Sequence, residues 1–345
     1  MTPSEFQTAV LDWFDQHGRK NLPWQQEISA YSVWVSEIML QQTQVATVIP
    51  YYQRFMQRFP NVQALARAPQ DDVLHHWTGL GYYARARNLH KTAQIVNSNH
   101  CGEFPNSVDA LQELPGIGRS TAGAICAIAY KKRATILDGN VKRVLARFQA
   151  IPGWPGKADT LKALWAVAES FTPAHRIADY TQAMMDLGAT LCMRSSPACQ
   201  HCPLNESCQA FVQGNPQDYP GKKPKRALPV KNCCFLVIIN SDGEILLQKN
   251  PPTGLWGSLW QFPQCESEND ISITCDKLGI SCEQTRKYPV QRHTFSHFHL
   301  DYQPIALTTT GYNTLSEDKN QVWYNRQNPL SLGLPKPVKA LLESL

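Results

Sequence analysis

The chain lacks the features that mark secreted and membrane proteins. Its longest apolar run, Cys233 to Ile239, is far shorter than the roughly 20 residues that a membrane-spanning helix needs. The first residues, Met1 to Gln7, contain neither the basic stretch nor the apolar core of a secretory signal. We therefore expect an intracellular, cytoplasmic protein that spans no membrane.

A strong excess of either charge is also missing. The 33 lysines and arginines against 28 aspartates and glutamates give a formal net charge of +5. This mildly basic balance suits a nucleic-acid partner but does not identify one, because many soluble proteins carry as much. With 345 residues, 43% of them hydrophobic, the chain can form about two domains with separate cores.

The first part of the chain has apolar residues at helical spacing, interrupted by proline and glycine. The pattern predicts helices over residues 4–17, 31–44, 62–68, 84–98, 108–114 and 121–130. We expect an all-α domain over residues 1–213. A linker over residues 214–230 should follow, because this stretch is rich in proline and carries the basic residues Lys222, Lys223, Lys225 and Arg226.

The spacing of apolar residues changes from helical to strand-like after residue 230. Short apolar or β-branched runs at 233–239 and 244–248 flank Ser241-Asp242-Gly243, which predicts a hairpin. Further strands are expected at 297–302 and 304–309, and a closing helix at 335–345. The second domain, over residues 231–345, is therefore predicted to be α+β.

Four of the eleven cysteines lie close together in the sequence. They follow the pattern C-x6-C-x2-C-x5-C, at Cys192, Cys199, Cys202 and Cys208. A reducing compartment disfavours structural disulfides, so this density indicates a metal site. Four thiolates can hold either one [4Fe–4S] cluster or one zinc ion. Only one tight C-x2-C pair is present, which favours iron–sulfur and leaves zinc open.

A glycine-rich turn separates two helical patterns at Leu114-Pro115-Gly116-Ile117-Gly118. Gly116 and Gly118 permit positive φ and a close approach of the backbone to a partner, while the next helix presents free N–H groups. Such a hairpin can bind a DNA phosphate without reading sequence. By itself, the pattern fits a plain turn between helices equally well.

Two carboxylates stand in different surroundings. Glu37 shares a helical face with Val33 and Leu40, so desolvation should raise its pKa. Asp138 directly precedes a helical pattern, and Lys142 lies one turn on, so its anion should be favoured. One protonated and one ionised carboxyl group are what acid-assisted glycosidic cleavage needs. Taken singly, Glu37 fits a surface ion pair and Asp138 a helix cap.

The segment from Trp34 to Thr43, W-V-S-E-I-M-L-Q-Q-T, closely resembles the adenine glycosylase, or MutY-type, branch of the helix-hairpin-helix endonuclease III superfamily. The glycine-rich hairpin and the cysteine spacing resemble the same superfamily. The resemblance implies a [4Fe–4S] cluster on the four cysteines. It also implies that Glu37 protonates the leaving adenine and that Asp138 stabilises or traps the sugar cation.

The same resemblance implies DNA and substrate contacts. Gln42 and Tyr82 are the candidate wedges that fill the gap left by a flipped base, and Trp24 and Gln182 would line the adenine pocket. Lys142 and Ser120 complete the predicted contacts in the catalytic domain. In the bifunctional branch a lysine nucleophile stands where this chain has Ser120, so we expect hydrolysis without strand cutting. Arg85 and Arg87 are suited to phosphate contact.

The second domain also carries a resemblance. The segment from Gly254 to Pro263 is similar to the G-L-W…F-P segment of the Nudix fold. The acidic R-E-x-x-E-E helix of Nudix hydrolases does not follow, which argues against pyrophosphatase activity. In MutY-type enzymes this domain recognises 8-oxoguanine, and Phe295, Ser296 and His297 match the F-S-H recognition loop of that family.

The leading hypothesis is a monofunctional, monomeric adenine glycosylase that acts on double-stranded DNA with adenine opposite 8-oxoguanine or guanine. One alternative is another helix-hairpin-helix glycosylase with lyase activity. A second is a non-catalytic DNA-damage binder, which needs the hairpin and the cluster but not Glu37. The third is a nucleotide pyrophosphatase. End-labelled duplexes that carry single defined lesions would separate these alternatives.

Overall fold

The computed structural model describes residues 1–224, 227–310 and 320–345, so Lys225 and Arg226 of the predicted linker lie outside the described residues. The chain forms two compact units, one of residues 1–67 with 88–225 and the other of residues 68–87 with 226–345. Among the described residues, no helix is long and apolar enough to cross a membrane.

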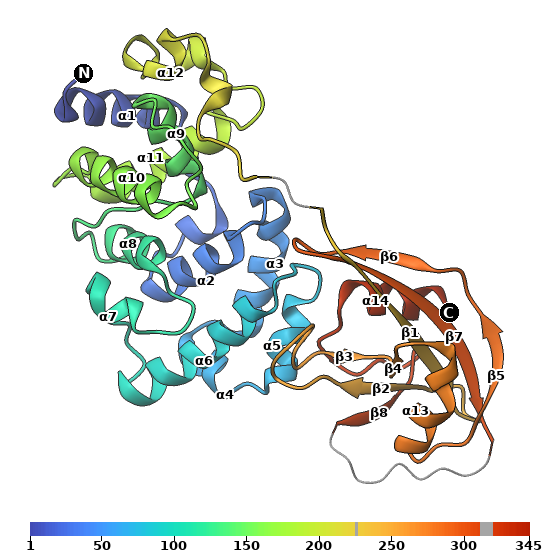
Figure 1. Cartoon of the computed structure of the whole chain (residues 1–345). Coiled ribbons are helices and arrows are strands. Elements are labelled where there is room, and N and C mark those ends of the chain that lie inside the picture. Colours follow the sequence, from blue (N-terminus) through green and yellow to red (C-terminus); the bar gives the residue numbers. More distant parts are fainter. Residues whose placement is uncertain (225–226, 311–319) are drawn as a thin grey trace. The chain divides into compact units, whose positions relative to one another are not determined.

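The first unit is built from helices and short 3₁₀ turns (Figure 1). Its longer helices are α1 (Pro3–His17), α2 (Ala30–Leu40), α3 (Val45–Arg58), α4 (Val62–Arg67), α6 (Ala84–Asn99, whose first turn counts with the second unit), α7 (Val108–Gln112), α8 (Arg119–Ile128), α9 (Gly139–Phe148), α10 (Ala158–Phe171) and α11 (Ile177–Thr190). The short elements are η1 (Pro23–Gln25), η2 (Cys199–His201), η3 (Asn205–Ser207), α12 (Gln209–Val212) and η4 (Pro216–Asp218).

An aromatic cluster holds four of these helices together. Phe6 of α1 lies with its ring centroid 4.8 Å from Phe148 at the end of α9 and 4.5 Å from Phe171 at the end of α10. Leu187 of α11 is fully buried in the same core. Aromatic side chains bury large apolar areas and prefer such tilted contacts, so this cluster fixes α9, whose first residue follows Asp138.

The second unit is a mixed sheet with helices (Figure 1). The hydrogen-bonded strand order is β3-β2-β1-β7-β5. In addition, β4 pairs with β1, β6 pairs with β7 and β8 pairs with β2. The elements are α5 (Gln70–Trp77), β1 (Val230–Ile239), β2 (Ile245–Lys249), β3 (Trp260–Gln261), β4 (Gln264–Cys265), η5 (Glu268–Asp270), α13 (Ile271–Lys277), β5 (Cys282–Lys287), β6 (Gln291–Thr294), β7 (His299–Thr309), β8 (Gln321–Tyr324) and α14 (Lys336–Ser344).

The expectation of two separate strands at 297–302 and 304–309 is wrong, because one strand, β7, covers this stretch. Proline lacks an N–H group and usually interrupts a central strand, which is why the sequence suggests a break at Pro304. In the structure, Pro304 lies opposite the gap between β5 and β6. There only its carbonyl is used, as the acceptor of a 3.0 Å hydrogen bond from the N–H of Tyr288.

The second unit also includes α5 and the turn that follows it. Asp71 of α5 forms an ion pair of 2.9 Å with Lys249 on β2. The hydroxyl of Tyr83 donates to the carbonyl of Leu334 at 2.8 Å, and Arg87 donates to that of Gly257 at 2.8 Å. Residues 68–87 are therefore bound to segments more than a hundred residues later in the sequence.

Candidate active site

Glu37 projects from α2, a helix buried over most of its length. Ser29 is the N-cap of this helix, and its Oγ accepts a 3.0 Å hydrogen bond from the N–H of Ser32. The Glu37 side chain is half-buried. Burial raises the pKa of Glu37 to about 8, and the negative charge of Asp138 contributes to the rise. This carboxyl group therefore holds a proton at neutral pH.

Asp138 is the N-cap of α9, and its Oδ1 accepts a 2.8 Å hydrogen bond from the N–H of Val141. The expectation that the helix end keeps its pKa low is wrong in direction. Burial raises the pKa of Asp138 and outweighs that hydrogen bond and the nearby charges of Arg143 and Lys142, which lower it. The negative charge of an ionised Asp138 favours the protonated form of Glu37.

Two contacts place Asp138 in this position. The Oγ of Ser120, in the first turn of α8, accepts a 3.0 Å hydrogen bond from the N–H of Leu137. On the other side, α11 lies against the first turn of α9. A Cβ atom on Gly188 would come within 2.5 Å of the Asn140 Cβ and 2.9 Å of its Cα. Only glycine fits at residue 188 without moving the backbone beside Asp138.

The hairpin of Gly116 and Gly118 has one residue in the left-handed backbone region. Gly116 has φ +80°, and a Cβ there would lie 2.9 Å from that of Asn88. Gly118 does not adopt the positive φ that glycine permits, because it is the N-cap of α8 with φ −87°. A Cβ on Gly118 would meet no atom within 4 Å, and both glycines are exposed. The hairpin backbone at both glycines is therefore accessible to a partner.

The two candidate wedges each have an unusual backbone. Gln42, directly after α2, has φ 58°, and Tyr82, before α6, has φ 49°. Both side chains are exposed, Tyr82 by 49%. Positive φ in residues other than glycine costs about 1–3 kcal/mol and concentrates at functional positions. Nothing in the sequence indicated this conformation.

The arginines beside Tyr82 are not placed as the sequence suggests. Arg85 is buried, with its guanidinium 5.4 Å from the ring of Trp77, and it donates to the carbonyls of Leu80 and Gly81. Arg87 donates to the carbonyl of Gly257. The expectation that Arg85 faces a phosphate is therefore wrong, because this side chain holds the turn together from inside.

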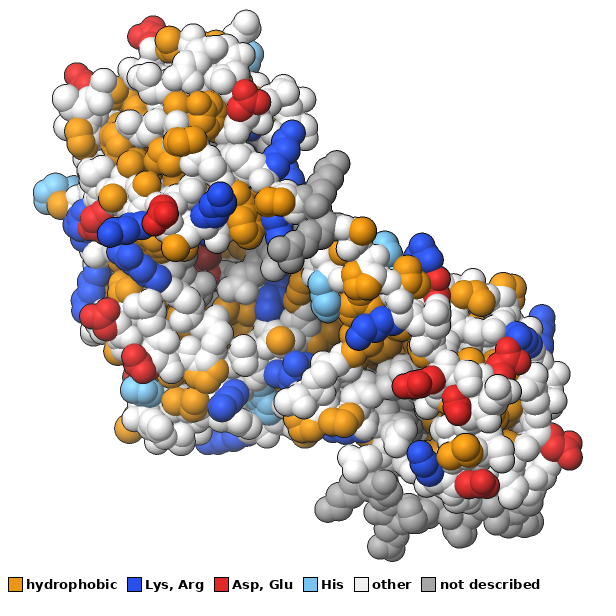
Figure 2. All heavy atoms as spheres, in the orientation of Figure 1, with side chains coloured by type: hydrophobic (Ala, Val, Ile, Leu, Met, Phe, Trp, Pro, Cys, Tyr) orange, Lys and Arg blue, Asp and Glu red, His pale blue; other side chains and the backbone are white. Residues whose placement is uncertain are grey.

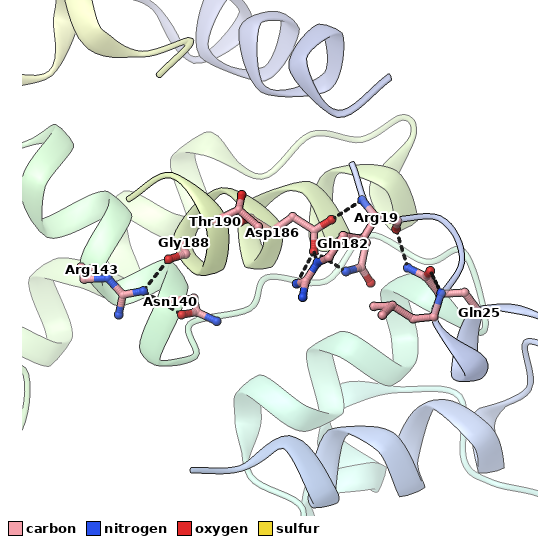
Figure 3. A network of polar contacts seen from close by, with 9 residues as sticks. Arg19, Gln25, Asn140, Arg143, Gln182, Asp186, Gly188 and Thr190 are labelled. Atoms are coloured by element: carbon pink, nitrogen blue, oxygen red, sulfur yellow. Dashed lines mark hydrogen bonds and ion pairs between the residues drawn. The ribbon is translucent and has the colours of Figure 1, made fainter. Parts of the chain in front are cut away.

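Trp24 and Gln182 come from opposite ends of the helical unit's sequence. Trp24 is buried in η1, edge-on to the ring of Tyr52 at 5.4 Å. Gln182 is half-buried on α11, and its Nε2 donates to the Asp186 carboxylate at 2.8 Å (Figure 3). Sequence analysis did not single out Asp186, which is fully buried and also paired with Arg19.

The four cysteines lie in the loop after α11, and two arginines of α9 hold this loop. Arg143 donates through Nε to the Cys192 carbonyl and through Nη2 to the Gly188 carbonyl, each at 2.6 Å, and Figure 3 shows the contact with Gly188. Arg147 is only 2% exposed. Its guanidinium donates to the backbone carbonyls of Met193, Arg194, Pro216 and Tyr219. Sequence analysis missed both arginines.

A single cavity is lined by Cys192, Cys199, Cys202 and Cys208 together with Arg147 and apolar residues. Burial raises the pKa of Cys202 to about 12, and the charge of Cys192 adds to this rise, so the thiols are close neighbours. Across the described parts of the chain, no three cysteine, histidine or acidic side chains are arranged as a metal centre. The thiols thus surround one cavity without a preassembled coordination sphere.

In the second unit, Phe295, Ser296 and His297 form the tight turn between β6 and β7. The N–H of Phe295 donates to the carbonyl of Phe298 at 2.9 Å, and their rings stack at 4.5 Å. Trp256 packs on Phe295 at 5.6 Å, so the two motifs noted in this domain meet. Ser296 and His297 are exposed and available to a partner.

Charge is spread over the visible surface. On the face shown in Figure 2, lysine and arginine side chains of the helical unit lie scattered among acidic, apolar and uncharged ones. No single block of basic side chains stands out on this face.

Comparison with known proteins decides the family. A sequence model of the HhH-GPD superfamily of base excision DNA repair proteins matches residues 35–170, and a NUDIX domain model matches residues 234–344. The chain is 40% identical to the adenine DNA glycosylase of Buchnera aphidicola (subsp. Acyrthosiphon pisum, strain APS), over 100% of this chain and 98% of that protein. It belongs to the adenine DNA glycosylase family.

A more distant member of the adenine DNA glycosylase family, from Homo sapiens, is 33% identical over 89% of this chain and 67% of that protein. Among solved structures, a thermostable thymine-DNA glycosylase has a TM-score of 0.55 and 24% identity, over 61% of this chain and 97% of its own. An endonuclease III–DNA complex has a TM-score of 0.52 and 20% identity, over 62% and 98%. These two structures share the helical fold.

The comparisons confirm two predictions from the sequence. The first is membership of the adenine glycosylase branch, and the second is a helical domain followed by a Nudix-like domain with a mixed sheet. The adenine DNA glycosylase family thus accounts for nearly the whole chain. The roles of individual residues rest on the geometry described above.

The raised pKa of Glu37 makes stability depend on pH. The folded protein keeps this proton up to about pH 8, whereas the unfolded chain loses it near its ordinary pKa of 4.5. The stabilisation is therefore complete below the unfolded pKa and is lost as pH rises through the folded one, by at most about 1.4 kcal/mol per pH unit. We expect the free energy of unfolding of Glu37→Gln to exceed that of the wild type increasingly across this range.

Urea unfolding at several pH values measures this difference. Glu343→Gln is the matched control, because this glutamate is exposed on α14 and its replacement should give no such trend. Wild-type and Glu37→Gln curves that stay parallel across the whole range would contradict the burial of a protonated Glu37.

Proposed function

We propose that the chain is a monofunctional base-excision glycosylase that flips adenine out of double-stranded DNA and hydrolyses it when it is mispaired with 8-oxoguanine or guanine. The similarity to adenine DNA glycosylases supports adenine as the base. The observation that carries the chemistry is the raised pKa of Glu37, to which the nearby charge of Asp138, the N-cap of α9, contributes. The protein would act as a monomer on DNA inside the cell.

In this proposal the two carboxyl groups divide the reaction. Glu37 donates its proton to the leaving adenine, which makes the base a better leaving group. Asp138, ionised at the start of α9, stabilises or traps the sugar cation that forms. A water molecule then completes hydrolysis. Lys142 adds positive charge near Asp138 and helps to keep it ionised while Glu37 remains protonated.

A lyase step is not expected. That step needs an amine nucleophile where this chain has Ser120, and the Ser120 hydroxyl is already hydrogen-bonded to the N–H of Leu137. The alternative of a glycosylase with lyase activity therefore lacks its nucleophile at residue 120. The non-catalytic alternative does not explain why Glu37 is kept protonated beside Asp138 at the cost of stability.

Glu37→Gln tests the chemistry. The amide keeps the shape of the side chain but cannot deliver a proton, so we expect single-turnover excision of adenine to fall by about 10²- to 10⁴-fold. Binding to the mispair should survive. The measurement is single-turnover cleavage of an end-labelled duplex after alkali, with a parallel binding titration.

Two outcomes would count against the mechanism. Near wild-type excision by Glu37→Gln would remove Glu37 as the acid. Strand cutting by the wild type without alkali would restore the lyase alternative.

We propose that the cavity of the cysteine loop holds a [4Fe–4S] cluster through Cys192, Cys199, Cys202 and Cys208. The donor set fits, since four soft thiols line one apolar cavity. When bound, the cluster would cross-link the loop as a structural group and take no part in hydrolysis. The loop carries Arg194, which is exposed and suited to a phosphate contact.

Metal analysis separates iron from zinc. We expect about four irons per chain and little zinc. Cys199→Ser should lose iron, folded yield and DNA affinity together, because metal binding and folding of the loop are linked. Cys101→Ser, at an exposed cysteine outside the loop, is the control and should keep its iron. Stoichiometric zinc in protein made with ample iron would show that the cluster assignment is wrong.

We further propose that the domains divide the work. Residues 1–213 carry the catalytic pair, residues 214–230 form the linker, and residues 231–345 recognise 8-oxoguanine through Phe295, Ser296 and His297. The exposure of Ser296 and His297 at a rigid turn supports this role. 8-Oxoguanine differs from guanine by one carbonyl oxygen and one N–H group, so a few hydrogen bonds suffice to distinguish them.

The double variant Ser296→Ala with His297→Ala tests this division in the full chain. We expect the preference for 8-oxoguanine over guanine to fall about ten- to a hundredfold, while excision opposite guanine changes little. Ser241→Ala, in the exposed turn between β1 and β2, is the control. Affinities and single-turnover rates on both mispairs are compared at one salt concentration. An unchanged preference would show that Ser296 and His297 do not recognise 8-oxoguanine.

A further inference from the structure

Asp186 of α11 is a fully buried carboxylate with an unusual set of partners (Figure 3). Its Oδ2 accepts a 2.7 Å hydrogen bond from the backbone N–H of Arg19. Its Oδ1 accepts from Nε and Nη2 of the same arginine, at 2.9 and 2.6 Å, and from Nε2 of Gln182 at 2.8 Å. The charge is thus paired and its oxygens are satisfied, as burial requires.

The network continues through Arg19 to the turn that carries Trp24. The carbonyl of Arg19 accepts a 2.9 Å hydrogen bond from Nε2 of Gln25. The Oε1 of Gln25 in turn accepts one from the N–H of Leu22, also at 2.9 Å, which closes η1 around Trp24. Asp186 therefore orders both segments that carry predicted adenine contacts, the turn at Trp24 and the helix at Gln182.

The carboxylate also fixes which way the Gln182 amide faces. An ionised carboxylate only accepts hydrogen bonds, so the amide must turn its NH₂ group toward Asp186. Its carbonyl oxygen, Oε1, then faces away from Asp186. Within the residues that the structure describes, no donor lies at hydrogen-bond distance from this oxygen. Gln182 is half-buried, so it offers a fixed acceptor to a ligand.

We propose that Asp186 is a positioning residue that makes the site selective for a purine with a hydrogen-bond donor at position 6. Adenine carries an amino group there, which Oε1 of Gln182 can accept. Hypoxanthine and guanine carry a carbonyl oxygen, which would face another acceptor and leave both unpaired. The inference rests on the proposed function, because it assumes that Gln182 faces the flipped base.

The test compares three target bases in otherwise identical duplexes, opposite the same partner base. They are adenine, unsubstituted purine with hydrogen at position 6, and hypoxanthine. The variants are Asp186→Asn, Gln182→Met and the two combined. Asp179→Asn is the matched control, since Asp179 lies on the same helix in an exposed ion pair with Arg176. The readout is the ratio of single-turnover excision rates, normalised to the wild type.

In Asp186→Asn the side chain can donate as well as accept, so the Gln182 amide is no longer held in one orientation. We expect the ratio of adenine to purine excision to fall about tenfold. The ratio of adenine to hypoxanthine should fall further, because a turned amide can donate to the carbonyl. Gln182→Met should lower the adenine-to-purine ratio similarly, and the combined variant no further. Asp179→Asn should leave both ratios unchanged.

A purely structural ion pair predicts a different result. The rates on all three bases would then fall together in Asp186→Asn with both ratios unchanged, and this outcome would overturn the inference. If Asp186→Asn does not fold, Gln182→Met still decides, since it removes only a half-buried amide and leaves the pair of Arg19 and Asp186 in place. A wild-type ratio in folded Gln182→Met refutes the inference as well. Failure of the wild type to excise adenine refutes the proposed function and this inference with it.

Discussion

The pairing of buried and half-buried charges along α9 is the constraint on which the helical unit depends. Asp138 caps one end of this helix, and Arg143 and Arg147 lie along the rest of it. A buried guanidinium without acceptors costs several kcal/mol, so the cysteine loop and the start of the linker must turn their carbonyl groups toward the two arginines. One helix therefore anchors both Asp138 and the loop of the four cysteines.

The same principle operates on α11, where the buried Asp186 takes up the charge of Arg19. The contact at Gly188 brings α11 against the first turn of α9. Two helices that face each other thus hold Asp138 and Gln182, to which we assign the stabilisation of the sugar cation and the reading of the base, and α11 itself is held by a partner far away in the sequence. The geometry of such a site depends on the packing of the whole unit and not on any single loop.

Sequence analysis predicted the elements whose evidence is local. The helical spacing of apolar residues predicted a helix over residues 84–98, close to α6. Residue types and their spacing identified Glu37 and the four clustered cysteines as candidates. It missed α3, which contains Pro50, a residue that normally signals the end of a helix. It also missed Asp186, whose partner Arg19 lies 167 residues away. The pKa direction at Asp138 was wrong because a cap is visible in sequence, whereas burial is a tertiary property.

The second unit is built from two segments that lie far apart in the sequence, and this has a consequence for biosynthesis. Residues 68–87 leave the ribosome long before residues 226–345, on which they pack. At a synthesis rate of about 5–20 residues per second, Lys249 is added to the chain roughly ten seconds or more after its ion-pair partner Asp71. Leu74, fully buried in the native protein, lacks its later neighbour Gly333 until translation is almost complete. The second unit can therefore mature only after the helical unit has been synthesised, which makes α5 a point where chaperones and proteases can act on the nascent chain.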